Sequence, residues 1–292
     1  MKNIYASASA VQKSLGVFCL IWIFYTVNSF AQKTDGTVNS LLETEIYFNN
    51  LVAKKGLNEA FMEVADKHGV VFKPMPLNII DYYSKQEPAD FELGWKPNFA
   101  IISKNGYFGV TAGLYTFKKQ EKLTFGHYVS VWKAGKNKKW KLALDAGISH
   151  KKPIAEAEPL FINPTNYKYS KLIGPKKIKM REDIVFSTDE LFGKALKNTG
   201  NINFTEYYAD DVRLYFPGEL PTIGKQRAIK FIDNRNQHVT SHPTFVDRAF
   251  SGDLAYTNGK ASIGVNQYNY IRVWRIGADM KWYILVDMYV EE

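Results

Sequence analysis

The stretch YIRVWRIGADMKWYILVD at Tyr270–Asp287 has an earlier counterpart, YVSVWKAGKNKKWKLALD at Tyr128–Asp145. Each stretch has two mainly apolar runs on either side of a short polar turn, a pattern that predicts a β-hairpin. Self-similarity at a fixed offset indicates a tandem repeat. The residues that recur at an offset of 142 positions include Tyr128, Trp132, Gly135, Trp140 and Asp145, which return as Tyr270, Trp274, Gly277, Trp282 and Asp287.

Each hairpin closes a longer unit that begins with helical patterns. Ser40 with Glu43, and Ser187 with Glu190, have the spacing of a capping box, which predicts the start of a helix in each repeat. Apolar and alternating runs follow, with Asn105-Gly106 as a hairpin turn in the first copy, and they predict about four antiparallel strands. Helices followed by a strand meander indicate the α+β class.

The repeat also predicts the domain organisation. We expect a first domain over residues 38–150, a linker over 151–185 and a second domain over 186–292. The linker is longer than most connections within a compact domain, and it has no sustained periodicity. It is also rich in proline, with Pro153, Pro159, Pro164 and Pro175.

Residues 1–31 have the composition of a signal peptide. Lys2 and Lys13 precede the apolar run Leu15–Val27, which is short for a membrane span, and Ser29-Phe30-Ala31 has the small-x-small form of a cleavage site. A single N-terminal anchor is the alternative. We expect cleavage near Ala31, and a periplasmic or secreted protein with no membrane association once the signal is removed.

Cysteine content and charge narrow the function classes. Cys19 is the only cysteine and lies in the signal segment, so the rest of the chain has no disulfide and no cysteine metal site. Lysine and arginine number 38 against 29 acidic residues; without Lys2 and Lys13 the count is 36 against 29, a formal charge of +7. The excess lies in a turn and in the linker, without a stacked-aromatic motif, so we expect solvated loops and no nucleic-acid surface.

Further motifs are distributed over both repeats. They are AFMEVADKHGVVFKP (Ala60–Pro74), Trp95-x-Pro97, SKNGYFGVTAG (Ser103–Gly113), YYADDVRLYFPG (Tyr207–Gly218), the Gly-Lys-x-x-Ala-Ile helix (Gly224–Ile229) and GDLAYTNG (Gly252–Gly259). Together with the hairpins, they resemble the nuclear-transport-factor-2-like superfamily, specifically the SnoaL-like branch shared with ketosteroid isomerases and polyketide cyclases. These motifs are turns, helix starts and packing positions, so they indicate the fold and not the activity.

This resemblance implies two cone-shaped α+β barrels, each with N-terminal helices packed on a curved antiparallel sheet. An apolar pocket is expected at the open end of each cone. Members of the superfamily often dimerise through their sheets. We therefore expect the two repeats to pack as an internal pseudo-dimer.

Asp145 and Asp287 end the final strand of each repeat and are candidate catalytic carboxylates. If the two tryptophans of the first hairpin face each other, His127 lies opposite Asp145, and the pair could serve as an oriented general base. The alternative is an ordinary cross-strand polar pair. The second repeat has Asn269 where the first has the histidine.

Tyr208 with Asp211 is a second candidate acid–base pair, because the superfamily's isomerases and dehydratases place tyrosine and carboxylate groups around the pocket. Helix capping and packing are the alternative, and the full isomerase set of one tyrosine and two acids is not recognisable here. The residues that we expect to contact a ligand are Trp95, His238, Tyr256 and Arg272.

His238 and His242 are four residues apart, which would suit zinc only on a helix, and Pro243 argues against a helix there. We therefore expect no metal, and no cofactor motif is present. The sequence favours an exported protein that binds a small apolar or amphipathic molecule in a cone pocket without turnover. The alternative is an isomerase or lyase of the ketosteroid-isomerase or polyketide-cyclase type, with a carboxylate or histidine base, more readily in the second repeat than in the first.

Overall fold

The computed structural model describes residues 33–292 except residues 89, 156 and 172. The predicted signal peptide over residues 1–31 lies outside the described residues. Within the described part of the chain, no helix has both the length and the apolar character that crossing a membrane requires.

The first repeat folds into helices and a seven-stranded sheet, ordered β2-β1-β6-β5-β4-β3-β7. Its elements are α1 (Val38–Lys55), α2 (Leu57–Val64), β1 (Ala65–Phe72), β2 (Pro76–Asn78), α3 (Ile79–Tyr83), β3 (Glu92–Ile102), β4 (Phe108–Lys119), β5 (Lys122–Ala134) and β6 (Trp140–His150), with β7 (Leu160–Ile162) added from the linker. Strands β3 to β6 form the predicted antiparallel meander. However, β1 is parallel to β6 and β7 is parallel to β3, so the sheet is mixed.

The second repeat has the same plan, in a six-stranded sheet ordered β10-β11-β12-β13-β8-β9. Its elements are α4 (Pro175–Thr199), a 3-10 turn η1 (Asn201–Asn203), α5 (Phe204–Tyr207), β8 (Tyr208–Tyr215), β9 (Thr222–Ile223), α6 (Lys225–Asn234), β10 (Val239–Arg248), β11 (Leu254–Ile263), β12 (Asn266–Ile276) and β13 (Trp282–Glu291). Strand β8 is parallel to β13, as β1 is to β6. The α+β class predicted from the sequence is confirmed, with mixed sheets in place of antiparallel ones.

Both capping-box predictions were wrong about where the helices begin. Helix α1 begins at Val38, whose backbone N–H donates to the side-chain oxygen of Asn163 at 2.8 Å. Helix α4 begins at Pro175, which suits a first helical position because it has no N–H to satisfy. Ser40 and Ser187 therefore lie inside their helices, since the capping-box spacing is also compatible with a helix interior.

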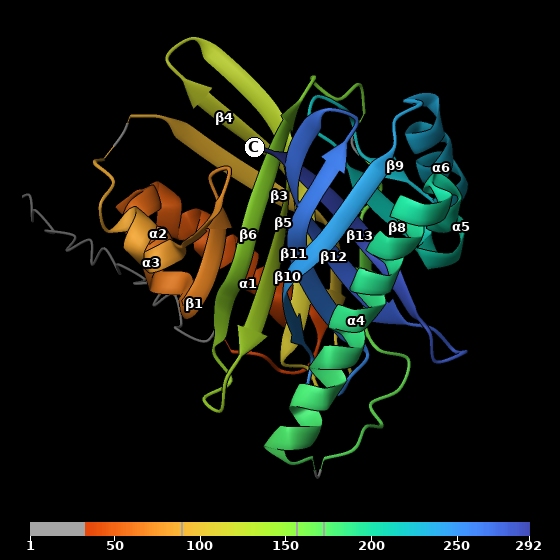
Figure 1. Ribbon diagram of the computed structural model, residues 1–292. Coiled ribbons are helices and arrows are strands. Elements are labelled where there is room, and N and C mark those ends of the chain that lie inside the picture. Colours follow the sequence, from red (N-terminus) through yellow and green to blue (C-terminus); the bar gives the residue numbers. More distant parts are fainter. Residues whose placement is uncertain (1–32, 89, 156, 172) are drawn as a thin grey trace, which may run out of the picture.

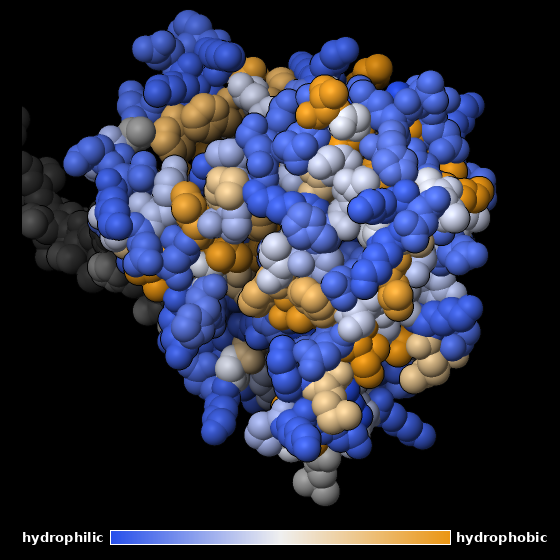
Figure 2. Space-filling view, viewed as in Figure 1, coloured by the Kyte–Doolittle hydropathy of each residue, from blue (hydrophilic) through white to orange (hydrophobic). Residues whose placement is uncertain are grey.

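The two sheets pack face to face, and the helices of the two repeats lie on opposite outer sides (Figure 1). A shared hydrophobic cluster joins β4, β5 and β6 to β11, β12 and β13; the rings of Phe108 and Tyr256 lie 6.3 Å apart within it. An ion pair from Lys133 to Asp247, at 2.5 Å, also crosses between the repeats. The face shown in Figure 2 is mainly hydrophilic, with hydrophobic residues in small groups.

Strand alternation places residues of each sheet on two different buried faces. In β5, Val129 and Val131 face the other sheet, whereas Tyr128 and Trp132 face the helices of their own repeat. In β12, residues 271 and 273 face the other sheet, and residues 270 and 274 face their own helices. Each repeat thus has an interior, enclosed by its own helices and sheet, that is separate from the interface between the sheets.

Candidate functional site

The interior of the first repeat contains a cavity of about 240 Å³. Much of its wall is aromatic: Phe48, Phe61, Tyr83, Phe91, Trp95, Tyr115, Phe117 and Tyr128. Four of these rings are in contact, because Phe61 lies 4.9 Å from Phe48 and 4.2 Å from Tyr83, and Phe48 lies 4.9 Å from Trp95. Such a wall suits a flat, mainly apolar molecule.

Asp145 supplies the carboxylate of this cavity. It lies across the hairpin from Ser130, whose hydroxyl donates to its Oδ1 at 2.6 Å. Asp145 is partly exposed, whereas Asp287, its counterpart in the second repeat, is completely buried. Burial raises the pKa of Asp145, against the opposing effects of the Ser130 hydrogen bond and the charge of Lys73.

Glu45 lies behind the aromatic wall, on the buried face of α1. Only 1% of it is exposed, and it accepts hydrogen bonds from Trp95 Nε1 at 2.7 Å, from Trp132 Nε1 at 2.9 Å and from the Thr111 hydroxyl. Burial raises the pKa of Glu45 to about 7 against the effect of these hydrogen bonds, and the charge of Asp145 adds to the rise.

This raised pKa predicts that stability falls as pH rises. Between the ordinary pKa of 4.5 and about 7, the unfolded chain releases the Glu45 proton while the folded protein retains it. The loss in free energy of unfolding over this window is about 3 kcal/mol. We expect urea unfolding from pH 4 to 8 to show this decline in the wild type, and a markedly shallower one in Glu45→Gln. Equal slopes in the two proteins would contradict a buried, titrating Glu45.

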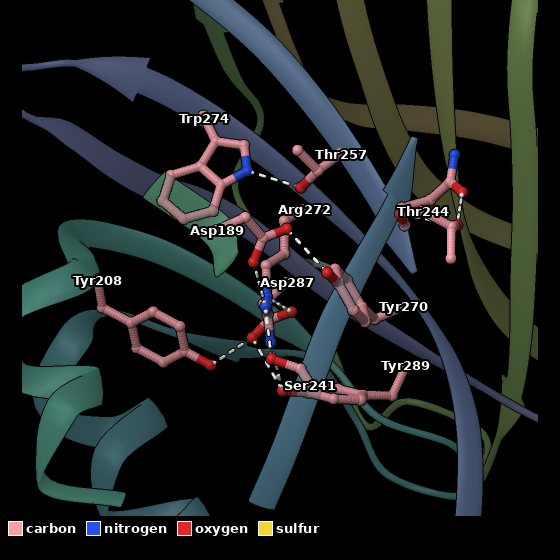
Figure 3. A network of polar contacts seen from close by, with 11 residues as sticks. Asp189, Tyr208, Ser241, Thr244, Thr257, Tyr270, Arg272, Trp274, Asp287 and Tyr289 are labelled. Carbon is pink, nitrogen blue, oxygen red and sulfur yellow. Dashed lines mark hydrogen bonds and ion pairs between the residues drawn. The ribbon is translucent and has the colours of Figure 1, made fainter. Parts of the chain in front are cut away.

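The interior of the second repeat is filled by an ion-pair network around Arg272 (Figure 3). Its Nη1 lies 2.6 Å from Asp189 Oδ1, and its Nε lies 3.2 Å from Asp287 Oδ1, with all three side chains completely buried. The hydroxyls of Tyr208 and Tyr289 donate to Asp287 at 2.8 and 3.2 Å. Burial disfavours the Arg272 cation, but the two carboxylates outweigh burial and raise its pKa.

The repeat register explains why one interior is hollow and the other is full. Ser130 pairs with Asp145 across β5 and β6, as Arg272 pairs with Asp287 across β12 and β13. At three matched positions the first repeat has the smaller residue: Ala65 for Tyr208, Ser130 for Arg272 and Gly147 for Tyr289. The isomerase or lyase alternative favoured the pocket of the second repeat, but the larger side chains occupy that interior.

The predicted pairing of His127 with Asp145 was wrong. The hairpin places Ala134, not Trp132, opposite Trp140, and a bulge follows at Ala143 in β6, so His127 lies opposite Ile148. His127 Nδ1 lies 2.6 Å from His150 Nε2, and burial, helped by the charges of His150 and Arg213, lowers its pKa to about 3. In the same way, Asn269 lies opposite Val290 and not Asp287.

His127 instead lines a larger cleft of about 660 Å³ between the repeats. Its walls come from β3 and β4, from linker residues 153, 155 and 157–159, and from β8 and β9. Arg213 is buried there with its guanidinium over the ring of Phe99, 4.4 Å from the ring centroid. Exposed linker chain forms one wall, the cleft lacks the aromatic wall of the smaller cavity, and the carboxylate that lines it, Glu158, is exposed.

The remaining predicted site residues are dispersed. Tyr208 and Asp211 do not form a pair, because Tyr208 bonds to Asp287 while Asp211 forms an ion pair with Arg275 at 2.6 Å. His238 is exposed at the end of a loop, and Tyr256 lies between the two sheets. Of the residues predicted to contact a ligand, Trp95 lines the cavity and Arg272 fills the second interior.

Two buried carboxylates were not identified from the sequence. Glu45 and Asp189 occupy matched places in α1 and α4, at the same offset of 144 positions as Phe48 with Phe192 and Gly56 with Gly200. The available signal was a carboxylate within the apolar stripe of an amphipathic helix, where a charged side chain must be paired or neutralised.

No protein-family model and no curated protein sequence matches this chain. Solved structures do align with it over about one repeat. They include a nuclear-transport-factor-2-like protein from Cytophaga hutchinsonii, at 16% identity and a TM-score of 0.32 over 38% of this chain and 98% of that one. Nuclear transport factor 2 from Cryptosporidium parvum aligns at 12% identity and a TM-score of 0.32, over 42% of this chain and 100% of its own.

A further protein of this type and of unknown function, from Shewanella oneidensis, aligns at 13% identity and a TM-score of 0.30, over 37% and 95% of the two chains. At such identities and TM-scores, these likenesses carry no argument about the ligand or the activity of this chain.

Proposed function

We propose that the protein binds a small, mainly apolar molecule in the cavity of its first repeat, and that the second repeat is a closed structural partner. The observation that carries this proposal is the difference between the two interiors. Matched positions hold Ser130 and Gly147 in the first repeat but Arg272 and Tyr289 in the second. A cavity of about 240 Å³ with an aromatic wall suits a ligand of one or two rings, below the roughly 300–1,000 Å³ of sites for drug-sized ligands.

The proposed setting is an exported, monomeric protein. Export follows from the signal-peptide pattern of residues 1–31. The cluster that joins the two sheets buries large residues on both sides, including Phe108 and Tyr256, which favours an internal pseudo-dimer over a dimer of whole chains. We expect native mass spectrometry to show a monomer as the main species.

Indole binding to the purified protein tests the proposed ligand site. We expect saturable binding by isothermal titration, with a loss of at least about tenfold in Ser130→Arg, because this change gives the first repeat the side chain that fills the second. Ser187→Arg, on the exposed side of α4, is the matched control and should bind like the wild type. Unaltered binding in a folded Ser130→Arg variant, shown by circular dichroism, would place the ligand elsewhere.

One observation favours proton-transfer catalysis as a second candidate. Asp145 is a carboxylate with a raised pKa in an aromatic cavity, and the hydroxyl of Tyr83, in the same wall, makes no hydrogen bond with the described residues. Such a carboxylate could take a proton from the carbon next to a carbonyl and return it to another carbon, as an isomerase without cofactor does.

The conversion of 3-cyclohexenone to its conjugated isomer, followed by ultraviolet absorbance, distinguishes binding from catalysis. Binding alone predicts no acceleration above the buffer rate. Turnover that disappears in Asp145→Asn, while indole binding persists, would replace the binding proposal by the isomerase.

A further inference from the structure

The interior of the second repeat holds a planar cation, the guanidinium of Arg272. The guanidinium of Arg272 lies between the carboxylates of Asp189 and Asp287. It also lies over two aromatic rings, 4.0 Å from the centroid of Tyr270 and 4.8 Å from that of Phe192. Two carboxylates and two ring faces together make a favourable environment for a planar cation.

The first repeat retains this environment but has no arginine. Glu45 matches Asp189, Asp145 matches Asp287, and Phe48 and Tyr128 match Phe192 and Tyr270. The residue at the position of Arg272 is Ser130, and the cavity lies there, with Asp145 and Ser130 both in its wall. Asp145, Phe48 and Tyr128 therefore line the space in which the second repeat holds a guanidinium, and Glu45 lies behind its aromatic wall.

Among the described residues, the two carboxylates of the first repeat, Asp145 and Glu45, have no buried cation as a partner. Asp145 receives the hydroxyl of Ser130 but forms no ion pair with the described residues, and Glu45 is bonded to two indole N–H groups and a hydroxyl. Lys73 lies in the wall of the cavity near its rim, and its charge acts on Asp145 without an ion pair. Unpaired carboxylates near a low-dielectric interior are costly, and a cation beside them would offset that cost.

We propose that the ligand of the first repeat is a small aromatic or apolar cation, with an amidinium, guanidinium or protonated amine that binds Asp145 in the space matched to the Arg272 guanidinium. This inference rests on the proposed ligand site in the first repeat and deepens it by naming the charge of the ligand. The apolar body of the ligand lies against the aromatic wall formed by Phe61, Tyr83 and Trp95.

Benzamidine and benzamide form a suitable pair of probes, because they have nearly the same shape and differ in charge. At pH 8 we expect isothermal titration to show that benzamidine binds roughly tenfold or more tightly than benzamide. Asp145→Asn should abolish this preference, so that the two probes bind the variant with similar affinities. Lys73→Met should strengthen benzamidine binding, because it removes the competing positive charge and leaves the carboxylate in place.

The outcomes separate the two proposals. Equal affinities of the wild type for the two probes would overturn the cationic ligand while leaving the ligand site intact. Failure of indole and of both probes to bind would overturn the ligand site itself. A benzamidine preference that persists in Asp145→Asn, or that falls in Lys73→Met, would show that another group selects the charge and would contradict the role given to Asp145.

Discussion

Replacing Arg272 by methionine should lower the free energy of unfolding of the second repeat by about 3–5 kcal/mol at pH 7.5. The change removes the cation that both Asp189 and Asp287 need, and it leaves two fully buried carboxylates without a positive partner. Urea unfolding followed by tryptophan fluorescence measures the loss, because Trp274 lies in the same interior.

The next arginine along the chain provides a matched control. Arg275 forms an ion pair with Asp211 at 2.6 Å, but both side chains are about one-third exposed. Arg275→Met should therefore cost under about 1 kcal/mol. Similar losses in the two variants would contradict the view that the Arg272 network is what stabilises this interior.

The free energy of unfolding of Arg272→Met should also depend on pH in a way that reflects its buried carboxylates. Burial raises the pKa of Asp287 and the charge of Arg272 opposes that rise, so removing the arginine moves this pKa further above that of the unfolded chain. The variant therefore regains stability as falling pH protonates Asp287. The difference in free energy of unfolding between the variant and the wild type should therefore become smaller as the pH falls from 8 to 5.

Replacing Gly113 by alanine should lower the free energy of unfolding of the first repeat by an amount comparable to the effect of Arg272→Met on the second. A Cβ atom at this position would lie 2.0 Å from the carbonyl oxygen of Lys96 and 2.7 Å from the Cα of Pro97, both of which are backbone atoms of the neighbouring strand. Backbone cannot move aside as the end of a side chain can, so we expect a loss of about 3 kcal/mol or more in the free energy of unfolding.

Gly94→Ala, in the adjacent strand β3, is the control for this prediction. Its Cβ would meet nothing closer than Thr116 Oγ1 at 3.8 Å, and its backbone is not in the left-handed region. Gly94→Ala should change the melting temperature little or raise it. Comparable melting temperatures for the two variants would show that the contact at Gly113 can relax.

The same close approach recurs in the second repeat, where a Cβ at Gly259 would lie 2.1 Å from the carbonyl oxygen of His242 and 2.7 Å from Pro243 Cα. Recurrence of Gly113 as Gly259 was visible in the sequence, and so were the paired tryptophans of the two hairpins. Positions such as these are dictated by backbone geometry and packing, which both repeats share. They explain why the fold class and the tandem arrangement were predictable.

The details of the site were less predictable because they depend on register. A β-bulge at Ala143 in β6, facing Val131 and Trp132, and a shorter turn than assumed place Ser130, and not His127, opposite Asp145. The sequence contains no strong signal for either feature. A one-residue slip moves every side chain of a strand to the other face, so a small error of register changes the whole predicted site.

The difference between the repeats could not be anticipated either. Ser130 and Arg272 occupy matched positions of similar stretches, yet their significance depends on knowing that both point into an interior beside a carboxylate. Glu45 lies within the apolar stripe of an amphipathic helix, a pattern that does not show what it contacts. Its role becomes clear only from the hydrogen bonds that Trp95 and Trp132 donate to it, and these tryptophans lie in strands far along the chain.

A crystal of the wild-type protein soaked with indole tests the central claim most directly, because it shows which interior accepts a ligand. The account predicts electron density for indole in the first repeat, against Tyr83 and Trp95 and near Asp145, and none beside Arg272. Indole in the second repeat, or only in the cleft between the repeats at Arg213, would contradict the account.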